Sequence, residues 1–183
     1  MLVYTSTEPP AADATLVHAA RDGDRAAFGV LYDRYKRMVH GILLAHVPYG
    51  DAEDLLQDVF VQAMRQLAHL REPAAFGGWL AAIARRRATD HHRRCKDTIE
   101  ANERNCGFSP QNAADRSEAE RVFEVIQHLP ETYRETLILR LVEGMTGPEI
   151  AARTGLTSDS VRVNLCRGMK LLRAQLRGEI DHE

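Results

Sequence analysis

The 183-residue sequence is poor in cysteine and has no long apolar run. Cys95, Cys106 and Cys166 are odd in number and show no CxxC spacing, so neither a disulfide framework nor a zinc ribbon is expected. No stretch approaches the roughly 20 apolar residues of a membrane-spanning helix, and the amino terminus lacks the basic start and apolar run of a signal peptide. We therefore expect a cytoplasmic protein with free thiols and no membrane insertion.

Signatures of catalysis and metal binding are also missing. The sequence has no HExxH, GxSxG or phosphate-loop motif, and the aspartates of residues 51–58 lack the spacing of a calcium loop. His91, His92 and Cys95 could hold part of a metal site, but no second ligand pair follows at zinc-site spacing. We expect no catalytic residue, no metal and no cofactor.

The formal charge is only -2, because 24 basic residues nearly balance 26 acidic ones. This total says little about partners, since the charges separate into acidic and basic blocks along the chain. The length fits one medium domain or two small ones. The distribution of residues along the chain has to decide between these options.

The first part of the chain changes from irregular to helical. Residues 1–13 contain a proline pair and few apolar residues, which predicts a disordered leader. Helical periodicity begins at Thr15, and Asp24 is expected to cap a long amphipathic helix that ends before Pro48. Asp51 is expected to cap the next helix.

The helix after Asp51 has two contrasting faces. At about 100° per residue, one face is apolar and predicts a core contact. Its members are Ala52, Leu55, Leu56, Val59, Phe60, Ala63 and Leu67. The opposite face carries Asp54, Gln57, Asp58, Gln62 and Arg65, with Val61 among them. A solvated face and a partner-binding surface both fit this pattern.

A third helix follows the loop Arg71-Glu72-Pro73. Its apolar stripe consists of Phe76, Trp79, Leu80, Ile83 and Ala84. Basic residues then point to all sides against Asp90 alone, namely Arg85, Arg86, Arg87, Arg93, Arg94 and Lys96. A helix that loses its apolar face and becomes basic all round is expected to leave the core and meet a polyanion. The alternative is a solvated basic end favoured by the helix dipole.

Residues 97–117 show no sustained period and are predicted to be a linker. The sequence therefore predicts an all-α protein with two small helical domains, 14–96 and 118–178, and a short tail at 179–183. Each domain is expected to hold about four helices.

The second domain contains a pattern typical of a helix-turn-helix. Thr146-Gly147-Pro148-Glu149 is a capping box, and Gly155 and Thr157 predict a tight turn and a new N-cap. The second helix has an apolar spine of Val161, Leu165, Gly168, Leu172 and Leu176. Its outward side carries Asp159, Ser160, Arg162, Val163, Cys166, Arg167, Lys170 and Arg173. That side suits a DNA major groove, although such helix pairs also occur as plain packing units.

Three segments, in matching order and spacing, resemble the extracytoplasmic-function sigma factors of the sigma-70 family. They are DAEDLLQDVF at residues 51–60, Phe76 through Trp79-Leu80 and Ile83-Ala84-Arg85 to Asp90, and Leu129-Pro130-Glu131 through Glu143-Gly144 to Glu149-Ile150-Ala151. The resemblance covers about residues 14–178. It implies an RNA polymerase specificity subunit that directs core polymerase to promoters, assists DNA melting and is controlled by an anti-sigma factor.

The resemblance also implies roles for individual positions. The surface that docks on the beta-prime clamp helices corresponds to Asp51, Asp54, Gln57, Asp58 and Val61, and the beta subunit is a further expected contact. The part that recognises and melts the -10 element corresponds to Arg71, Phe76, Trp79, Arg85, Arg86, Arg87, Arg93 and Arg94. The reader of the -35 element corresponds to Thr157, Ser158, Asp159, Ser160, Arg162, Val163, Arg167 and Lys170.

Three positions depart from the family pattern. Arg86 stands where asparagine is common, Asn164 where a basic residue is usual, and Met169 where arginine is usual. These departures leave the promoter sequence open. The sequence also leaves open the stimulus and the identity of an inhibitor. A stand-alone helix-turn-helix regulator is the main alternative, and it would bind duplex DNA without polymerase. An enzyme is the second alternative, with little in the sequence to favour it.

Overall fold

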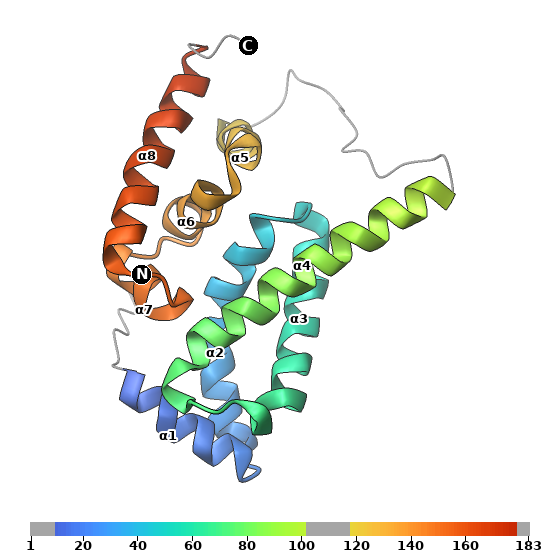
Figure 1. Ribbon diagram of the computed structural model, residues 1–183, viewed down its shortest axis with the longest axis vertical. Helices are drawn as coiled ribbons and strands as arrows, with labels where there is room; N and C mark the ends of the chain where they lie inside the picture. Colours follow the sequence, from blue (N-terminus) through green and yellow to red (C-terminus); the bar gives the residue numbers. More distant parts are fainter. Residues whose placement is uncertain (1–9, 102–117, 179–183) are drawn as a thin grey trace.

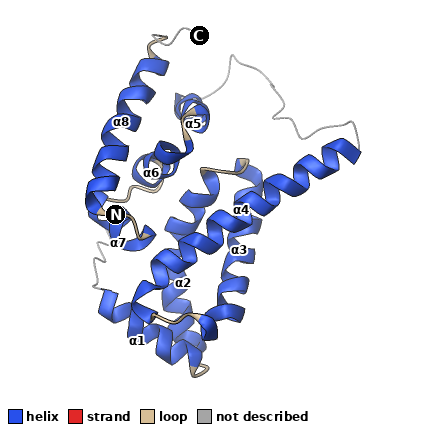
Figure 2. Cartoon of the chain, in the orientation of Figure 1, coloured by secondary structure: helices blue, strands red, loops and turns tan. Residues whose placement is uncertain are grey.

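The computed structural model describes residues 10–101 and 118–178, and their regular elements are all helical (Figure 2). The α-helices are α1 (Pro10–Arg21), α2 (Arg25–Leu44), α3 (Tyr49–Gln66), α4 (Phe76–Ala101), α5 (Glu118–His128), α6 (Glu131–Leu141), α7 (Gly147–Thr154) and α8 (Ser158–Leu176). Short 3-10 turns, Leu67–His69 and Pro73–Ala75, connect α3 to α4. The predicted all-α class, with four helices in each half, is confirmed.

The start of α2 forms as predicted, whereas that of α3 does not. The Asp24 carboxylate accepts hydrogen bonds from the backbone N–H groups of Ala26 and Ala27, at 2.8 and 3.1 Å. Helix α3 begins at Tyr49 after Pro48, which forms no side-chain cap. The prediction that Asp51 caps this helix is wrong, because the chain enters the helix directly after the proline. Asp51 lies in the first turn, where its charge suits the helix dipole.

Helix α1 extends into the predicted leader. Residues 10–13 are helical rather than disordered, while residues 1–9 lie outside the described chain. The buried Asp13 carboxylate accepts a hydrogen bond from the Tyr35 hydroxyl and pairs with Arg34. Burial, and then this carboxylate, raise the pKa of Tyr35. A polar side chain therefore ties α1 to α2 inside the first group of helices.

Helix α4 stays in the core one turn longer than the sequence pattern predicts. Its apolar stripe continues from Ala84 to Ala88, which is buried. The helix runs on to Ala101, so residues 97–101 of the predicted linker are helical, and residues 102–117 lie outside the described chain. Small alanines on one side keep α4 packed while arginines occupy its other sides.

The predicted helix-turn-helix is formed by α7 and α8. Thr146 and Glu149 make both bonds of the capping box, and Gly155 adopts a left-handed φ of 77° between the helices. Thr157 caps α8 by accepting from the Ser160 N–H at 3.1 Å. In the predicted spine of α8, Val161, Gly168 and Leu172 are buried and Leu165 is half-buried, whereas Leu176 is exposed.

The two groups of helices lie against each other, with α6 and α7 packed on α2 and α4 (Figure 1). Buried residues of both groups, such as Leu44 of α2 and Leu139 of α6, belong to one continuous core. The structure closes the two predicted domains around a shared apolar seam, which pattern reading of each half cannot show. None of the described helices is long and apolar enough to cross a bilayer.

Candidate nucleic-acid interface

The outward side of α8 is exposed along its length. The exposed residues include the N-cap Thr157 and the predicted readers Ser158, Asp159, Ser160, Arg162, Val163, Arg167 and Lys170. Arg162 lies 3.3 Å from the Asp159 carboxylate, and both side chains are more than three-quarters exposed. The first turn also presents backbone N–H groups and hydroxyls, which are suited to phosphate oxygens. The exposed side of α8 is therefore polar, and Arg162, Arg167 and Lys170 make it mainly basic.

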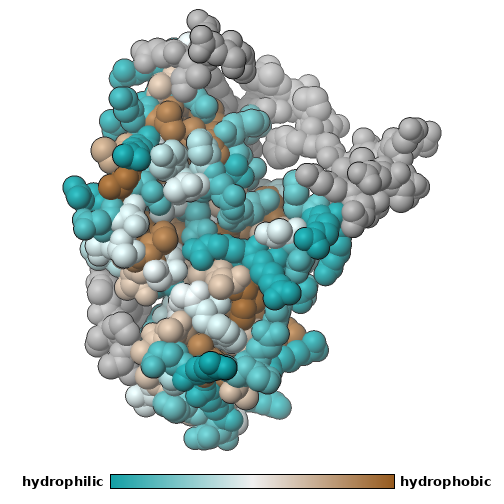
Figure 3. All heavy atoms as spheres, viewed as in Figure 1, coloured by the Kyte–Doolittle hydropathy of each residue, from teal (hydrophilic) through white to brown (hydrophobic). Residues whose placement is uncertain are grey.

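The predicted basic surface of α4 is less uniform. Arg86, Arg93 and Arg94 are exposed, as is Arg71 before the helix, whereas Arg87 is half-buried. Hydrophilic residues gather over the middle of α4 in the view of Figure 3. The expectation that basic groups leave the core on every side is wrong for Arg85, which turns toward the second group of helices.

The two aromatic residues predicted at the -10 surface lie mainly in the core. Phe76 is fully buried, with ring centroids 5.2 Å from Tyr35 and 5.8 Å from Trp79. Trp79 is half-buried. Of the two roles expected for Phe76, core packing and DNA contact, the structure places it in the first.

The predicted polymerase-binding face forms one exposed surface on α3. Asp54, Gln57, Asp58 and Val61 are all exposed, and the apolar Val61 has 47% of its surface accessible. Met64, one turn further on, is 51% accessible and extends the apolar part of this face. Asp51 lies apart from it, with its carboxylate 3.6 Å from His91 Nε2 of α4.

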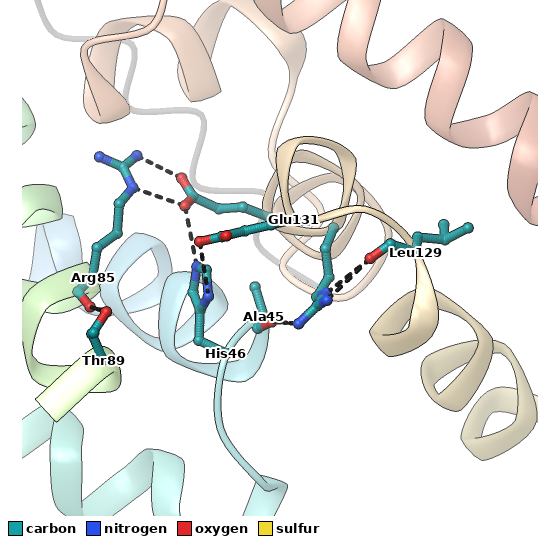
Figure 4. Close-up of polar contacts among 8 residues, drawn as sticks. Ala45, His46, Arg85, Thr89, Leu129 and Glu131 are labelled. Atoms are coloured by element: carbon teal, nitrogen blue, oxygen red, sulfur yellow. Dashed lines mark hydrogen bonds and ion pairs between the residues drawn. The ribbon is translucent and has the colours of Figure 1, made fainter. Parts of the chain in front are cut away.

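Arg85 of α4 is held by Glu135 of α6 (Figure 4). Its Nε and Nη2 donate to the two carboxylate oxygens at 2.9 and 2.7 Å, and the Glu135 side chain is only 10% exposed. Burial would raise the pKa of Glu135, but Arg85 and then His46 outweigh it and lower the pKa to about 2. The pair is therefore ionised at neutral pH.

Two histidines of the first group face carboxylates of the second. His46 Nδ1 lies 3.6 Å from Glu131, and its buried Nε2 lies 3.8 Å from Glu135, too far for a hydrogen bond. His40 Nδ1 is 2.7 Å from Glu143, and this hydrogen bond raises the pKa of His40 against the effect of burial. Sequence reasoning missed these pairs because the partners are distant along the chain. Glu135 is 50 residues from Arg85, and Glu143 is 103 residues from His40.

Comparison with known families identifies both halves of the chain. A model of Sigma-70 region 2 matches residues 31–98, and one of Sigma-70, region 4 matches residues 119–172. The chain belongs to the extracytoplasmic-function sigma factors of the sigma-70 family. It is 30% identical to the ECF RNA polymerase sigma-E factor of Haemophilus influenzae over 180 residues, covering 90% of this chain and 95% of the relative. The sigma-E factor of Escherichia coli K12 is 32% identical over 175 residues, covering 87% and 92%.

Solved structures agree with this assignment. CnrH, solved in complex with the cytosolic domain of CnrY, is 27% identical with a TM-score of 0.61, over 92% of this chain and 99% of CnrH. RpoE of Bartonella quintana, solved with the anti-sigma factor NepR, shares the fold at 19% identity and a TM-score of 0.55, over 84% of this sigma factor and 96% of RpoE. This sigma factor thus directs core RNA polymerase to promoter DNA in transcription initiation.

No three His, Cys, Asp or Glu side chains within residues 10–101 and 118–178 are placed to share a metal ion. His91 and Cys95 lie together on α4, with Sγ 3.9 Å from the ring nitrogens. These two side chains do not make a metal site in the part of the chain that the structure describes.

Proposed function

We propose that the two groups of helices divide the work of this sigma factor. Residues 14–96 bind core polymerase and recognise and melt the -10 element, and residues 118–178 read the -35 element. The observation that carries this proposal is the exposed polar and basic side of α8, mounted on a helix-turn-helix whose two caps are formed. Catalysis belongs to the polymerase, and the sigma factor acts beside it in the cytoplasm.

In the -35 reader, Arg162 and Arg167 are the candidates for base contact, because guanidinium groups pair bidentately with guanine edges. Thr157, Ser158 and Ser160 lie at the amino end of α8, where hydroxyl and backbone N–H groups bind phosphate. Lys170 is placed further along the helix for a second phosphate. These contacts would set the register of α8 in the groove.

In the -10 surface, the exposed Arg86, Arg93 and Arg94 would hold the DNA backbone, while Trp79 offers a ring to an unstacked base. Extruding a base costs a few kcal/mol, so a basic helix beside an aromatic ring is a suitable combination. Arg85 can join this surface only after it leaves Glu135.

The α3 face with Asp54, Asp58 and Val61 is proposed to dock on the beta-prime clamp helices, and the beta subunit is a further contact. Its mixture of carboxylates and one exposed valine suits a basic partner surface with an apolar centre. RpoE of Bartonella quintana was solved with an anti-sigma factor. We propose that a separate anti-sigma partner likewise covers the DNA-binding and polymerase-binding surfaces of this chain.

The test of the polymerase face is sequencing of transcripts started by purified core polymerase with and without this sigma factor. Asp58→Arg should reduce core binding and remove the sigma-dependent transcripts, with unchanged helical content. Asp33→Arg, an equal charge reversal on the exposed side of α2, is the matched control. Equal core affinity for Asp58→Arg and the unmodified chain would show that the surface is assigned wrongly.

The test of the -35 reader uses the same transcripts. Arg167→Ala should reduce dependence on the upstream element by about 1–3 kcal/mol if this arginine reads a base. Arg177→Ala, beyond the end of α8, should leave that dependence unchanged. Loss of dependence on the downstream element instead would reverse the two assignments, and tight binding to duplex DNA without polymerase would favour a stand-alone regulator.

A further inference from the structure

A cavity of about 210 Å³ lies where the end of α1, the start of α2 and the end of α3 meet. Its walls come from residues 20–28 on one side and from residues 64–68 on the other. The cavity belongs to the first group of helices alone, and it shares no residue with the DNA-binding candidates of α4 and α8. None of the roles proposed for this chain accounts for it.

Polar contacts between distant segments hold the walls of the cavity. Arg21, at the end of α1, donates from Nε to the carbonyl of Leu67 at 3.1 Å, and its guanidinium also reaches the carbonyl of Leu70. Asp24 caps α2 by accepting from two backbone N–H groups, and Gly23 before it takes a left-handed φ of 98°. The turn into α2 and the turn after α3 are thus fixed to each other, as in the preformed sites that small molecules use.

The interior of the cavity is apolar. The ring of Phe28 forms part of the wall and is itself packed edge-on against Phe60, with ring centroids 6.5 Å apart. Leu67, which is only 4% exposed, and the small Ala20 and Ala68 also line the space. Because alanine side chains are too short to fill it, the walls lack packing partners there. An apolar ligand group would supply those contacts.

The charged groups that line the cavity are mainly basic. They are Arg21, Arg25 and Arg65, against Asp24 alone. Arg21 and Asp24 are engaged with backbone groups of the chain. Arg25 and Arg65 are exposed, and they make no hydrogen bond or ion pair with any residue in the described part of the chain. Two helices thus present two guanidinium groups, which bind carboxylates well.

Size and charge together define the class of ligand. Sites for drug-sized molecules commonly have volumes of roughly 300–1,000 Å³. At about 210 Å³ this cavity suits a smaller molecule with one ring or a short branched chain. The apolar walls suit the body of that molecule, and Arg25 and Arg65 suit one anionic end. Met64, next to Arg65, is 51% exposed, and its flexible thioether side chain can adapt to the ligand.

We propose that this cavity binds a small organic acid, with the carboxylate at Arg25 and Arg65 and the apolar body against Phe28 and Leu67. The proposed polymerase-binding face of α3 is acidic and suits a basic partner surface, which the two arginines would repel. The acid site is therefore separate from that contact. It can be tested without polymerase or DNA, so its failure and the failure of the proposed function are distinguishable.

Phenylacetate is the probe, because it carries one ring and one carboxylate. Phenylacetamide keeps the ring without the charge, and acetate keeps the charge without the ring. Backbone amide signals of the full chain, followed by nuclear magnetic resonance during titration, report where and how tightly each compound binds. Phenylacetate should give saturable shifts at residues 20–28 and 64–68, and the other two compounds should bind at least about fivefold more weakly.

Two results of this titration would overturn the proposal. Equal binding of phenylacetamide would show that the two arginines do not select an anion. The absence of saturable shifts with millimolar phenylacetate would show that the cavity is not a binding site for small acids.

Variants test where the ligand lies. Ala68→Leu fills the cavity, and Arg65→Gln removes one of its charges. Ala82→Leu, at an exposed position of α4, and Arg177→Gln, after the end of α8, are the matched controls. Ala68→Leu should abolish saturable binding of phenylacetate, Arg65→Gln should weaken it about fivefold, and the controls should leave it unchanged. Unchanged binding in Arg65→Gln would contradict the proposal even if Ala68→Leu fails to fold.

A capped Glu-Phe dipeptide distinguishes a site for free acids from a pocket that docks a protein. The dipeptide offers the same ring and a single carboxylate, but on a peptide backbone. Since the cavity is small, phenylacetate should bind at least as tightly as the dipeptide. If the dipeptide shifts the same residues and binds more tightly, the cavity docks an acidic protein segment and the small-acid proposal is wrong.

Discussion

Helices α4 and α8 both carry a run of basic residues, but the fold uses them differently. On α8, Arg162, Arg167 and Lys170 stand exposed on the side away from the core. On α4, Arg85 is drawn into the seam between the two groups of helices and binds Glu135 with two hydrogen bonds. A basic pattern thus indicates that a helix binds anions, but it does not tell whether the anion is a phosphate or a carboxylate of the same chain.

The packing partners of the two helices explain this difference. Helix α8 rests on α6 through Gly168, whose Cβ position would lie 3.0 Å from Leu137 Cδ1 and 3.1 Å from Tyr133 Cβ. This close approach leaves the opposite side of α8 free of the core. Helix α4 lies between both groups of helices, so arginines on its sides meet protein as well as solvent.

The largest effect, on the free energy of unfolding, is expected from disrupting the contact between α6 and α8. Gly168→Leu should lower the free energy of unfolding by about 2–3 kcal/mol, because the side chain overfills the contact with α6. Urea unfolding of the full chain, followed by helical circular dichroism, measures this change. Gly29→Leu, in open space on α2, should not lower the free energy of unfolding, because leucine is a better helix former than glycine and meets no other atom there. Equal effects of the two changes would contradict the close α6–α8 contact.

A smaller effect is expected in the coupling energies of two arginine–carboxylate pairs, Arg85–Glu135, which joins α4 to α6, and Arg162–Asp159 on α8. In double-mutant cycles, Arg85→Gln with Glu135→Gln should give a coupling energy of about 1–2 kcal/mol, because the pair is bidentate and largely buried on the carboxylate side. Arg162→Gln with Asp159→Asn should give less than about 0.5 kcal/mol, since both side chains are exposed. Similar couplings would remove the contrast between α4 and α8.

The smallest effect is a pH dependence of the closed seam. The pKa of Glu135 is depressed from 4.5 to about 2, so its contribution is present above pH 4.5 and is lost as the pH falls. The pKa of His40 is raised from 6.5 by Glu143, with Glu53 adding a weaker attraction, so its contribution is present below pH 6.5 and is lost as the pH rises.

Closure should therefore be strongest between about pH 4.5 and 6.5, and it should weaken as the pH rises toward 8. Energy transfer between one dye on Thr15→Cys of α1 and another on the exposed Cys166 of α8, with Cys95 and Cys106 changed to serine, measures this dependence. Arg37 of α2 also faces Glu143, with Nε 3.7 Å from its carboxylate. His40→Gln should remove the weakening of closure above pH 6.5 and leave the dependence below pH 4.5 unchanged. If closure still weakens above pH 6.5 in this variant, another group is responsible.

Local patterns predicted the elements of the fold and the exposed faces well. The Asp24 cap, the capping box at Thr146 and the turn at Gly155 depend on neighbours within a few residues, and all three formed. The pattern misjudged Asp51, where a preceding proline started the helix earlier, and Ala88, where a small residue continued a core face that looked finished.

The sequence by itself determined the helical class, the helix-turn-helix and the family, because periodicity, caps and spaced motifs act over short distances along the chain. Only the tertiary structure decided that Arg85 meets Glu135, that His40 meets Glu143, and that Gly41 admits Leu139. These partners come from separate domains, and each residue alone looks like an ordinary surface charge or a helix glycine. Their contacts arise from tertiary packing, which brings together segments that are distant along the chain. No local sequence pattern encodes which of these segments meet.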